Sequence, residues 1–190
     1  MSKIKKMNLN KKSTKIYRIS KTDFIFETVG IIGIINKNGE FCWAMDLYAQ
    51  ENEFEGVEVS PKFSFTELEE TRNFIKNKEY IWENTSAYSK EKDDWIGSFY
   101  IFDAHFFKSK IQLIKKNNES FDVIIKGKVN LNWETAKNTD SKNFHIENNI
   151  PFNGILCEIE DKEECLKIAG KFINIEGMKW IDDDEKWLRY

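Results

Sequence analysis

Apolar and polar residues alternate along residues 121–133. The apolar members share one parity, which only Gly127 interrupts: Phe121, Val123, Ile125, Val129, Leu131 and Trp133. Charged and amide side chains dominate the other parity: Asp122, Lys126, Lys128, Asn130 and Asn132. In an extended chain this spacing separates the two sets onto opposite faces. The pattern therefore predicts one strand, or two strands meeting at Gly127, in an antiparallel sheet with one face in water.

Further strands are predicted on both sides of this segment. Residues 24–35 and 40–48 are rich in β-branched and aromatic side chains and flank the turn residues Asn38 and Gly39, so they predict a hairpin. Residues 95–107 are apolar on both parities. That composition predicts a central strand covered on both faces.

Two helices are expected. Thr66 and Glu69 have the spacing of a capping box for a short helix that runs to about residue 75. Asp161 and Glu164 predict the start of a second helix, which continues at helical spacing to about residue 172. The second helix should pack on the sheet through its apolar face.

Polar segments mark the connections. Residues 1–15 have no apolar periodicity and hold six Lys without an acidic residue, which predicts a flexible basic tail. Residues 76–94 and 135–149 are predicted to be long connections because they contain little to bury. The remaining chain, 16–190, has a length that suits a single domain.

These patterns predict the fold class. We expect an α+β fold, a mostly antiparallel twisted β-sheet or partly closed β-sandwich of about seven to nine strands. A C-terminal helix should pack on this sheet.

The charge balance differs between the tail and the body. The whole chain has 29 basic and 32 acidic side chains, a net charge of -3, but without the six tail lysines the body has 23 basic against 32 acidic, a balance of -9. An acidic body disfavours broad binding to nucleic acid, which requires a continuous basic surface. It suits a protein partner with a basic surface, because charge complementarity accelerates encounter.

The cysteines and the apolar runs indicate a cytoplasmic protein. The three cysteines are widely spaced and form no Cys-x-x-Cys pair, which is typical of reduced thiols. The longest apolar run, 29–35, is far shorter than the roughly 20 residues that span a bilayer. The Lys-rich start lacks the apolar region of a signal peptide.

Asp103 and His105 are the strongest candidates for metal or catalytic chemistry. They interrupt an apolar strand at i and i+2, so both side chains leave one face and could supply two metal ligands. A third ligand is missing from any recognisable spacing, and the same pair could simply bind neighbouring backbone groups. We therefore assign no metal and no cofactor. The acidic residues Glu51, Glu53, Glu55 and Glu58 are a further carboxylate cluster that a glycosidase could use.

An acidic group lies near the C-terminus between two tryptophans. Asp182, Asp183, Asp184 and Glu185 form a predicted turn, with Trp180 and Trp187 on either side. In one interpretation the tryptophans anchor a partner and the carboxylates select a Lys/Arg-rich surface. In the other, both tryptophans lie in the core and the acids are a solvated turn.

The predicted function follows from these properties. No recognisable catalytic set is present, which favours a binding protein over an enzyme. We expect a small cytoplasmic inhibitor that occludes a protein partner, most concretely an immunity or antitoxin-like protein that neutralises a toxin. The alternative is an enzyme or a carbohydrate- or ligand-binding β-fold with a site near Asp103 and His105. No nucleic-acid or membrane partner is expected.

Overall fold

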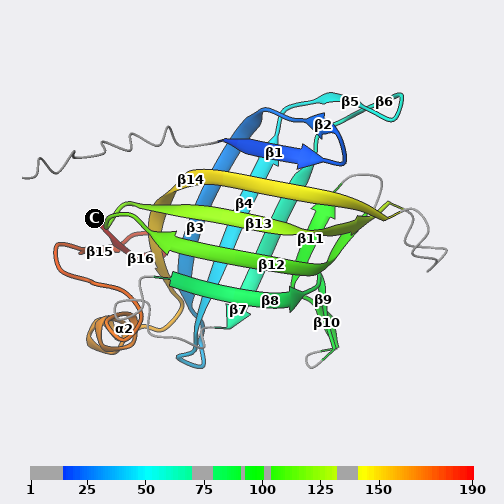
Figure 1. Ribbon diagram of the computed structural model, residues 1–190. Coiled ribbons are helices and arrows are strands. Elements are labelled where there is room, and N and C mark those ends of the chain that lie inside the picture. Colours follow the sequence, from blue (N-terminus) through cyan, green and yellow to red (C-terminus); the bar gives the residue numbers. More distant parts are fainter. Residues whose placement is uncertain (1–14, 70–78, 91–92, 101–103, 132–140) are drawn as a thin grey trace, which may run out of the picture.

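The computed structural model describes residues 15–69, 79–90, 93–100, 104–131 and 141–190, and most of them lie in strands (Figure 1). In chain order the strands are β1 (Ile16–Ile19), β2 (Thr22–Asp23), β3 (Phe26–Ile35), β4 (Phe41–Ala49), β5 (Asn52–Phe54), β6 (Val57–Val59), β7 (Lys62–Glu69), β8 (Glu79–Thr85), β9 (Tyr88–Ser89), β10 (Asp94–Trp95), β11 (Gly97–Tyr100), β12 (His105–Lys115), β13 (Ser120–Asn130), β14 (Ser141–Cys157), β15 (Lys179–Asp182) and β16 (Lys186–Arg189). The helix of the described residues is α2 (Lys162–Ala169).

Twelve of these strands form one curled, mixed sheet, which folds into two layers whose strands cross in Figure 1. The front layer has the order β8-β12-β13-β14-β1-β2 and the back layer the order β11-β7-β4-β3-β14-β16-β15. The long strand β14 belongs to both layers. Its first part pairs antiparallel with β13 and β1, and its end pairs parallel with β3 and antiparallel with β16.

Aromatic side chains fill the space between the layers. Trp43 of β4 has no exposed surface, and its ring contacts Tyr80 and Phe121 of the front layer at centroid distances of 5.6 Å. Phe63 of β7 contacts Phe106 of β12 at 4.8 Å. Because such rings bury large apolar areas, this cluster supplies much of the driving force that holds the layers together.

The alternating segment is confirmed as a half-buried strand. On β13 the side chains of Phe121, Val123, Ile125 and Val129 have no exposed surface, whereas Lys126 and Lys128 are exposed. The strand does not divide at Gly127, because its pairing with β14 continues without a shift from Ser120 to Asn130. Leu131 is half-buried, and 132–133 lie outside the described residues.

The hairpin and the C-terminal helix are also confirmed. β3 and β4 pair antiparallel around a turn in which the side chain of Asn36 accepts hydrogen bonds from the backbone N–H groups of Asn38 and Glu40. The carboxylate of Asp161 accepts from the N–H groups of Glu163 and Glu164 and so caps α2. The helix ends at Ala169, earlier than predicted, and its buried residues include Cys165 and Ile168.

The predicted strand number and pairing need correction. The sheet has more than seven to nine strands, and it is mixed because β14 pairs parallel with β3. Part of the excess comes from 76–94, which is not one long connection: it contains β8 of this sheet, and also β9, which pairs with β10 in a separate two-stranded sheet. Thr66 and Glu69 belong to β7 and do not begin a helix there, and 70–78 lie outside the described residues.

Two segment predictions fail for a shared reason. The run 95–107 is not a central strand, because it divides between the short β10, the edge strand β11 of the back layer and the start of β12 in the front layer. The second half of 135–149 is not a connection but the start of β14. In both segments, pairing with strands that are distant in sequence decides where a strand begins and which of its side chains face the core. Residues 1–14, and with them almost all of the predicted tail, lie outside the described residues.

Candidate functional site

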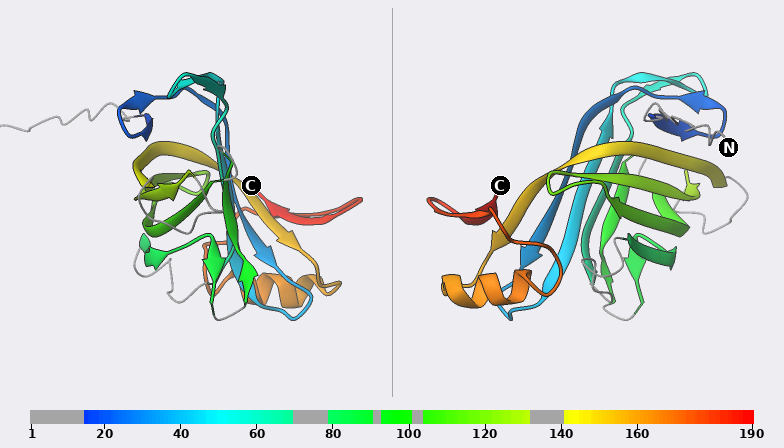
Figure 2. Two further views of the ribbon diagram at one scale, coloured as in Figure 1. Left: turned by 90° about the vertical axis from the view of Figure 1, so that its right-hand side faces the viewer. Right: turned by 60° about the vertical axis from the view of Figure 1, so that its left-hand side comes forward.

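The C-terminal strands β15 and β16 form a hairpin that projects from the body of the molecule (Figure 2). β16 also pairs with the end of β14, which attaches the hairpin to the sheet. The turn residues Asp183, Asp184 and Glu185 are exposed, as is Asp182. The hairpin predicted around the acidic group is therefore present.

The two tryptophans lie on opposite faces of this hairpin. Trp180 is opposite the buried Leu188 and packs, half-buried, against the core. Trp187 is opposite Ile181, whose side chain is 41% exposed, so these two belong to the other face. The guanidinium carbon of Arg189 lies 4.1 Å from the centroid of the Trp187 ring. The outward face of the hairpin thus combines an indole, an aliphatic and a cationic group.

A second acidic segment lies beside the hairpin. Glu158, Glu160, Asp161, Glu163 and Glu164 are exposed in and before the first turn of α2. Nζ of Lys186 on β16 is 2.9 Å from Oε2 of Glu160, which ties the two segments together. The hydrogen bond with Glu160 raises the pKa of Lys186. We call these five residues, with 182–185, the acidic surface.

The structure describes one member of the Asp103 and His105 pair. His105 is half-buried at the start of β12, and burial lowers its pKa. Its ring lies 4.8 Å from the ring of Trp95, which in turn contacts Tyr88 at 5.4 Å. Asp103 lies outside the described residues. Within the described ranges no three His, Cys, Asp or Glu side chains come together as a metal site.

The glutamates of the β5–β6 hairpin and the preceding Glu51 are exposed to solvent. Glu53 and Glu58 are directly opposite each other and are exposed, as is Glu51. The turn between the strands is Glu55-Gly56, and Glu55 pairs with Lys142 of β14. This arrangement is typical of a solvated hairpin.

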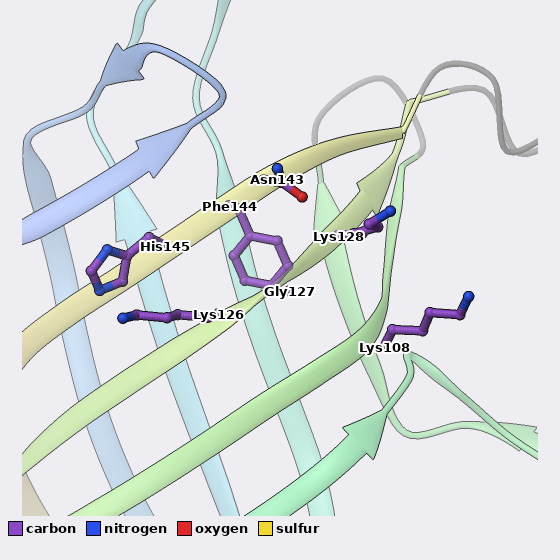
Figure 3. Close-up of a pocket in the computed structure, with 7 residues that line it drawn as sticks. All are labelled: Lys108, Lys126, Gly127, Lys128, Asn143, Phe144 and His145. Atoms are coloured by element: carbon purple, nitrogen blue, oxygen red, sulfur yellow. The ribbon is translucent and has the colours of Figure 1, made fainter.

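A pocket of about 480 Å³ lies on the front layer, away from the predicted site residues (Figure 3). It is lined by three lysines and four residues of β13 and β14: Lys108, Lys126, Gly127, Lys128, Asn143, Phe144 and His145. Lys126 is directly opposite His145, and Lys128 is directly opposite Asn143. No local pattern in the sequence indicates this pocket, because the lysines have the spacing of a solvated strand face and only the strand register brings them together.

The surroundings of the pocket shift the pKa of His145. Burial lowers the pKa of His145, and the positive charge of Lys126 lowers it further, while Glu147 opposes both effects. Its Nε2 lies 3.4 Å from Oε2 of Glu147. At neutral pH the imidazole is therefore neutral and the pocket's positive charge resides on the lysines.

The lowered pKa of His145 predicts a stability change with pH. As the pH falls below the ordinary histidine value of about 6.5, the unfolded chain binds a proton that the folded protein resists, so stability decreases. His145→Gln should lose less stability than the wild type between about pH 7.5 and 5.5. Urea unfolding at each pH measures this difference. Equal losses in the two proteins would contradict the prediction.

Comparisons with protein-family models, with curated proteins and with solved structures find no match to this chain. Among the helical residues that the structure describes, none form a helix long and apolar enough to cross a membrane.

Proposed function

We propose that this chain is a protein-binding inhibitor, an immunity or antitoxin-like protein that neutralises a basic partner by covering its active surface. The observation that carries the proposal is the projecting β15–β16 hairpin, with its exposed acidic turn and its outward Trp187 and Ile181. Cys42, Cys157 and Cys165 are buried thiols, which suits action in the cytoplasm.

The acidic surface supplies the selectivity. It combines four carboxylates of the hairpin with five from the start of α2, and Lys186 is neutralised by Glu160. A dense negative surface accelerates encounter with a basic partner and disfavours acidic proteins. The partner would therefore present Lys and Arg side chains around the active-site groove that this protein covers.

The outward face of the hairpin supplies the anchor. Trp187 and Arg189 are residue types that dominate binding energy at protein interfaces, and the contact between them restricts both side chains before binding. Because the hairpin projects outward from the edge of the sheet (Figure 2), it can enter a concave site. Trp180 is a positioning residue, since it holds the hairpin against the core.

Replacing Asp182, Asp183 and Asp184 together by Asn tests this proposal. Folding should be unchanged because all three side chains are exposed. Association with the partner should slow by roughly an order of magnitude at low salt, and its salt dependence should weaken, because exposed charges act through long-range steering. The probe is the product of the adjacent gene, titrated at low and moderate salt.

A matched control changes the same number of charges elsewhere. Glu51, Glu53 and Glu58, on the far β5–β6 side of the molecule (Figure 1), are exposed and can be replaced together by Gln. This control should associate at nearly the wild-type rate. Equal slowing in both triple variants, or no complex with the wild type, would count against an inhibitor that uses the acidic surface.

The second candidate function is ligand binding near His105. The observation that favours it is the exposed indole of Trp95, 53% accessible, in contact with the rings of Tyr88 and His105. Exposed aromatic rings can stack on sugars and other planar or apolar ligands. Replacing Asp103 and His105 by Ala should abolish a metal- or ligand-dependent activity and leave partner binding unchanged. Metal retained by the wild type and lost in this variant would support the second candidate.

A further inference from the structure

The register of the front layer aligns basic side chains across neighbouring strands. Arg18 of β1 is opposite His145 of β14, and His145 is opposite Lys126 of β13. Residues directly opposite one another in antiparallel strands point to the same face, with Cα atoms roughly 5 Å apart. Lys128 lies two residues further along β13, on the same face. The solvent-facing side of this layer therefore gathers positive charge (Figure 3).

A β-bulge adds a third lysine to this group. The pairing of β12 with β13 shifts between Phe107 and Lys110, so Lys108 and Ser109 together lie opposite Gly127. Lys108 has a φ of 49°, an unfavourable value for a residue with a side chain. Ser109 points inward and is buried, whereas Lys108 is exposed and lines the pocket. Bulges commonly redirect a side chain at functional sites.

The three lysines of the pocket have no acidic partner within ion-pair distance among the residues that the structure describes. The neighbouring basic groups have acidic partners: Arg18 pairs with Asp23, and Lys110 with Glu83 at 2.9 Å. Among the ion pairs of the described residues, none involves Lys108, Lys126 or Lys128. Lys126 extends to one side of the pocket and Lys108 and Lys128 to the other, with Phe144 between them (Figure 3), so positive charges flank this pocket in a body whose overall charge is negative.

We propose that this lysine pocket binds a small molecule with several phosphate charges. Three ammonium groups can each donate hydrogen bonds to phosphate oxygens, and Asn143 adds an uncharged polar group beside them. The pocket, about 480 Å³ in volume, is broad and open to solvent, which suits a charged ligand that stays partly hydrated. The proposal is independent of the inhibitor function, which uses the acidic surface.

The surroundings favour a small ligand over a nucleic acid. A long polyanion requires a continuous basic track, but acidic side chains border this pocket: Asp23 at Arg18, Glu83 at Lys110 and Glu147 at His145. Those carboxylates would repel phosphates that extend beyond the three lysines. A compact polyphosphate group meets the lysines alone.

Calorimetric titration of the full-length protein with inorganic tripolyphosphate tests the proposal. The wild type should bind saturably, and inorganic phosphate should bind more weakly because it carries fewer charges. Lys126→Ala with Lys128→Ala should raise the dissociation constant at least about tenfold. Lys108→Gly removes the third amine and also the unfavourable φ, so it should weaken binding while the melting temperature stays equal or rises.

The control is a double variant with the same charge change. Lys37 and Lys171 are exposed, and neither lines the pocket; replacing both by Ala should leave the dissociation constant within about twofold. No saturable binding to the wild type would overturn the proposal. So would equal weakening by the control, which would indicate a general charge effect. Much tighter binding of a single-stranded polynucleotide than of tripolyphosphate would overturn it in favour of a nucleic-acid surface.

Discussion

Replacing Trp43 by Ala should lower the free energy of unfolding by about 3–5 kcal/mol. The indole has no exposed surface and contacts both layers, with centroid distances of 5.6 Å to Tyr80 and Phe121 and 6.0 Å to Phe152. Removing it leaves a cavity that the surrounding strands cannot close without losing their register. Urea unfolding, with the slope compared between variants, measures the change.

Trp187 provides the control for this prediction. Its indole is half-buried on the outward face of the C-terminal hairpin and contacts Arg189. Trp187→Ala should therefore cost less than about 1 kcal/mol, because little packing is lost. Similar costs for the two substitutions would show that Trp43 does not hold the layers together.

Replacing Gly154 by Ala should lower the free energy of unfolding by about 2–4 kcal/mol. Gly154 has a φ of +113°, and it lies where β14 leaves the front layer and shifts its register against β3. A Cβ there would be 2.5 Å from the carbonyl oxygen of Leu188 and 2.6 Å from Cγ of Arg189. Backbone strain and displacement of β16 therefore act together.

Gly56→Ala separates these two effects. Gly56 also has a positive φ, +85°, but no atom lies within 4 Å of the position of an added Cβ. Gly56→Ala should lower the free energy of unfolding by only about 1 kcal/mol, because it adds backbone strain without a steric contact. Amide hydrogen exchange should quicken in β15 and β16 in the Gly154 variant and not in the Gly56 variant. Unchanged amide exchange in β15 and β16 of the Gly154 variant would show that displacement of β16 does not cause its loss of stability.

Local patterns in the sequence determined several elements. The alternation along β13, the Asn-Gly hairpin between β3 and β4, the Asp161 cap of α2 and the acidic C-terminal turn were all predictable. Each depends on side chains within a few residues of one another. Strand periodicity, turn chemistry and capping operate over that range.

Pairing between distant segments decided the rest. The sequence of the first half of β14 is typical of a polar connection. It forms a strand because β13 pairs with one of its edges and β1 with the other. Its parallel pairing with β3, more than one hundred residues away in sequence, makes the sheet mixed. Such contacts depend on which edges meet after folding, and no local pattern encodes them.

The same division applies to the candidate sites. The acidic turn and its two tryptophans are evident in the sequence, but the register of β15 against β16 decides that Trp180 faces the core and Trp187 faces outward. The lysine pocket has no counterpart in any local pattern. It exists because a bulge in β12 and the register of β13 against β14 bring Lys108, Lys126 and His145 to one face, and register is a property of the folded sheet.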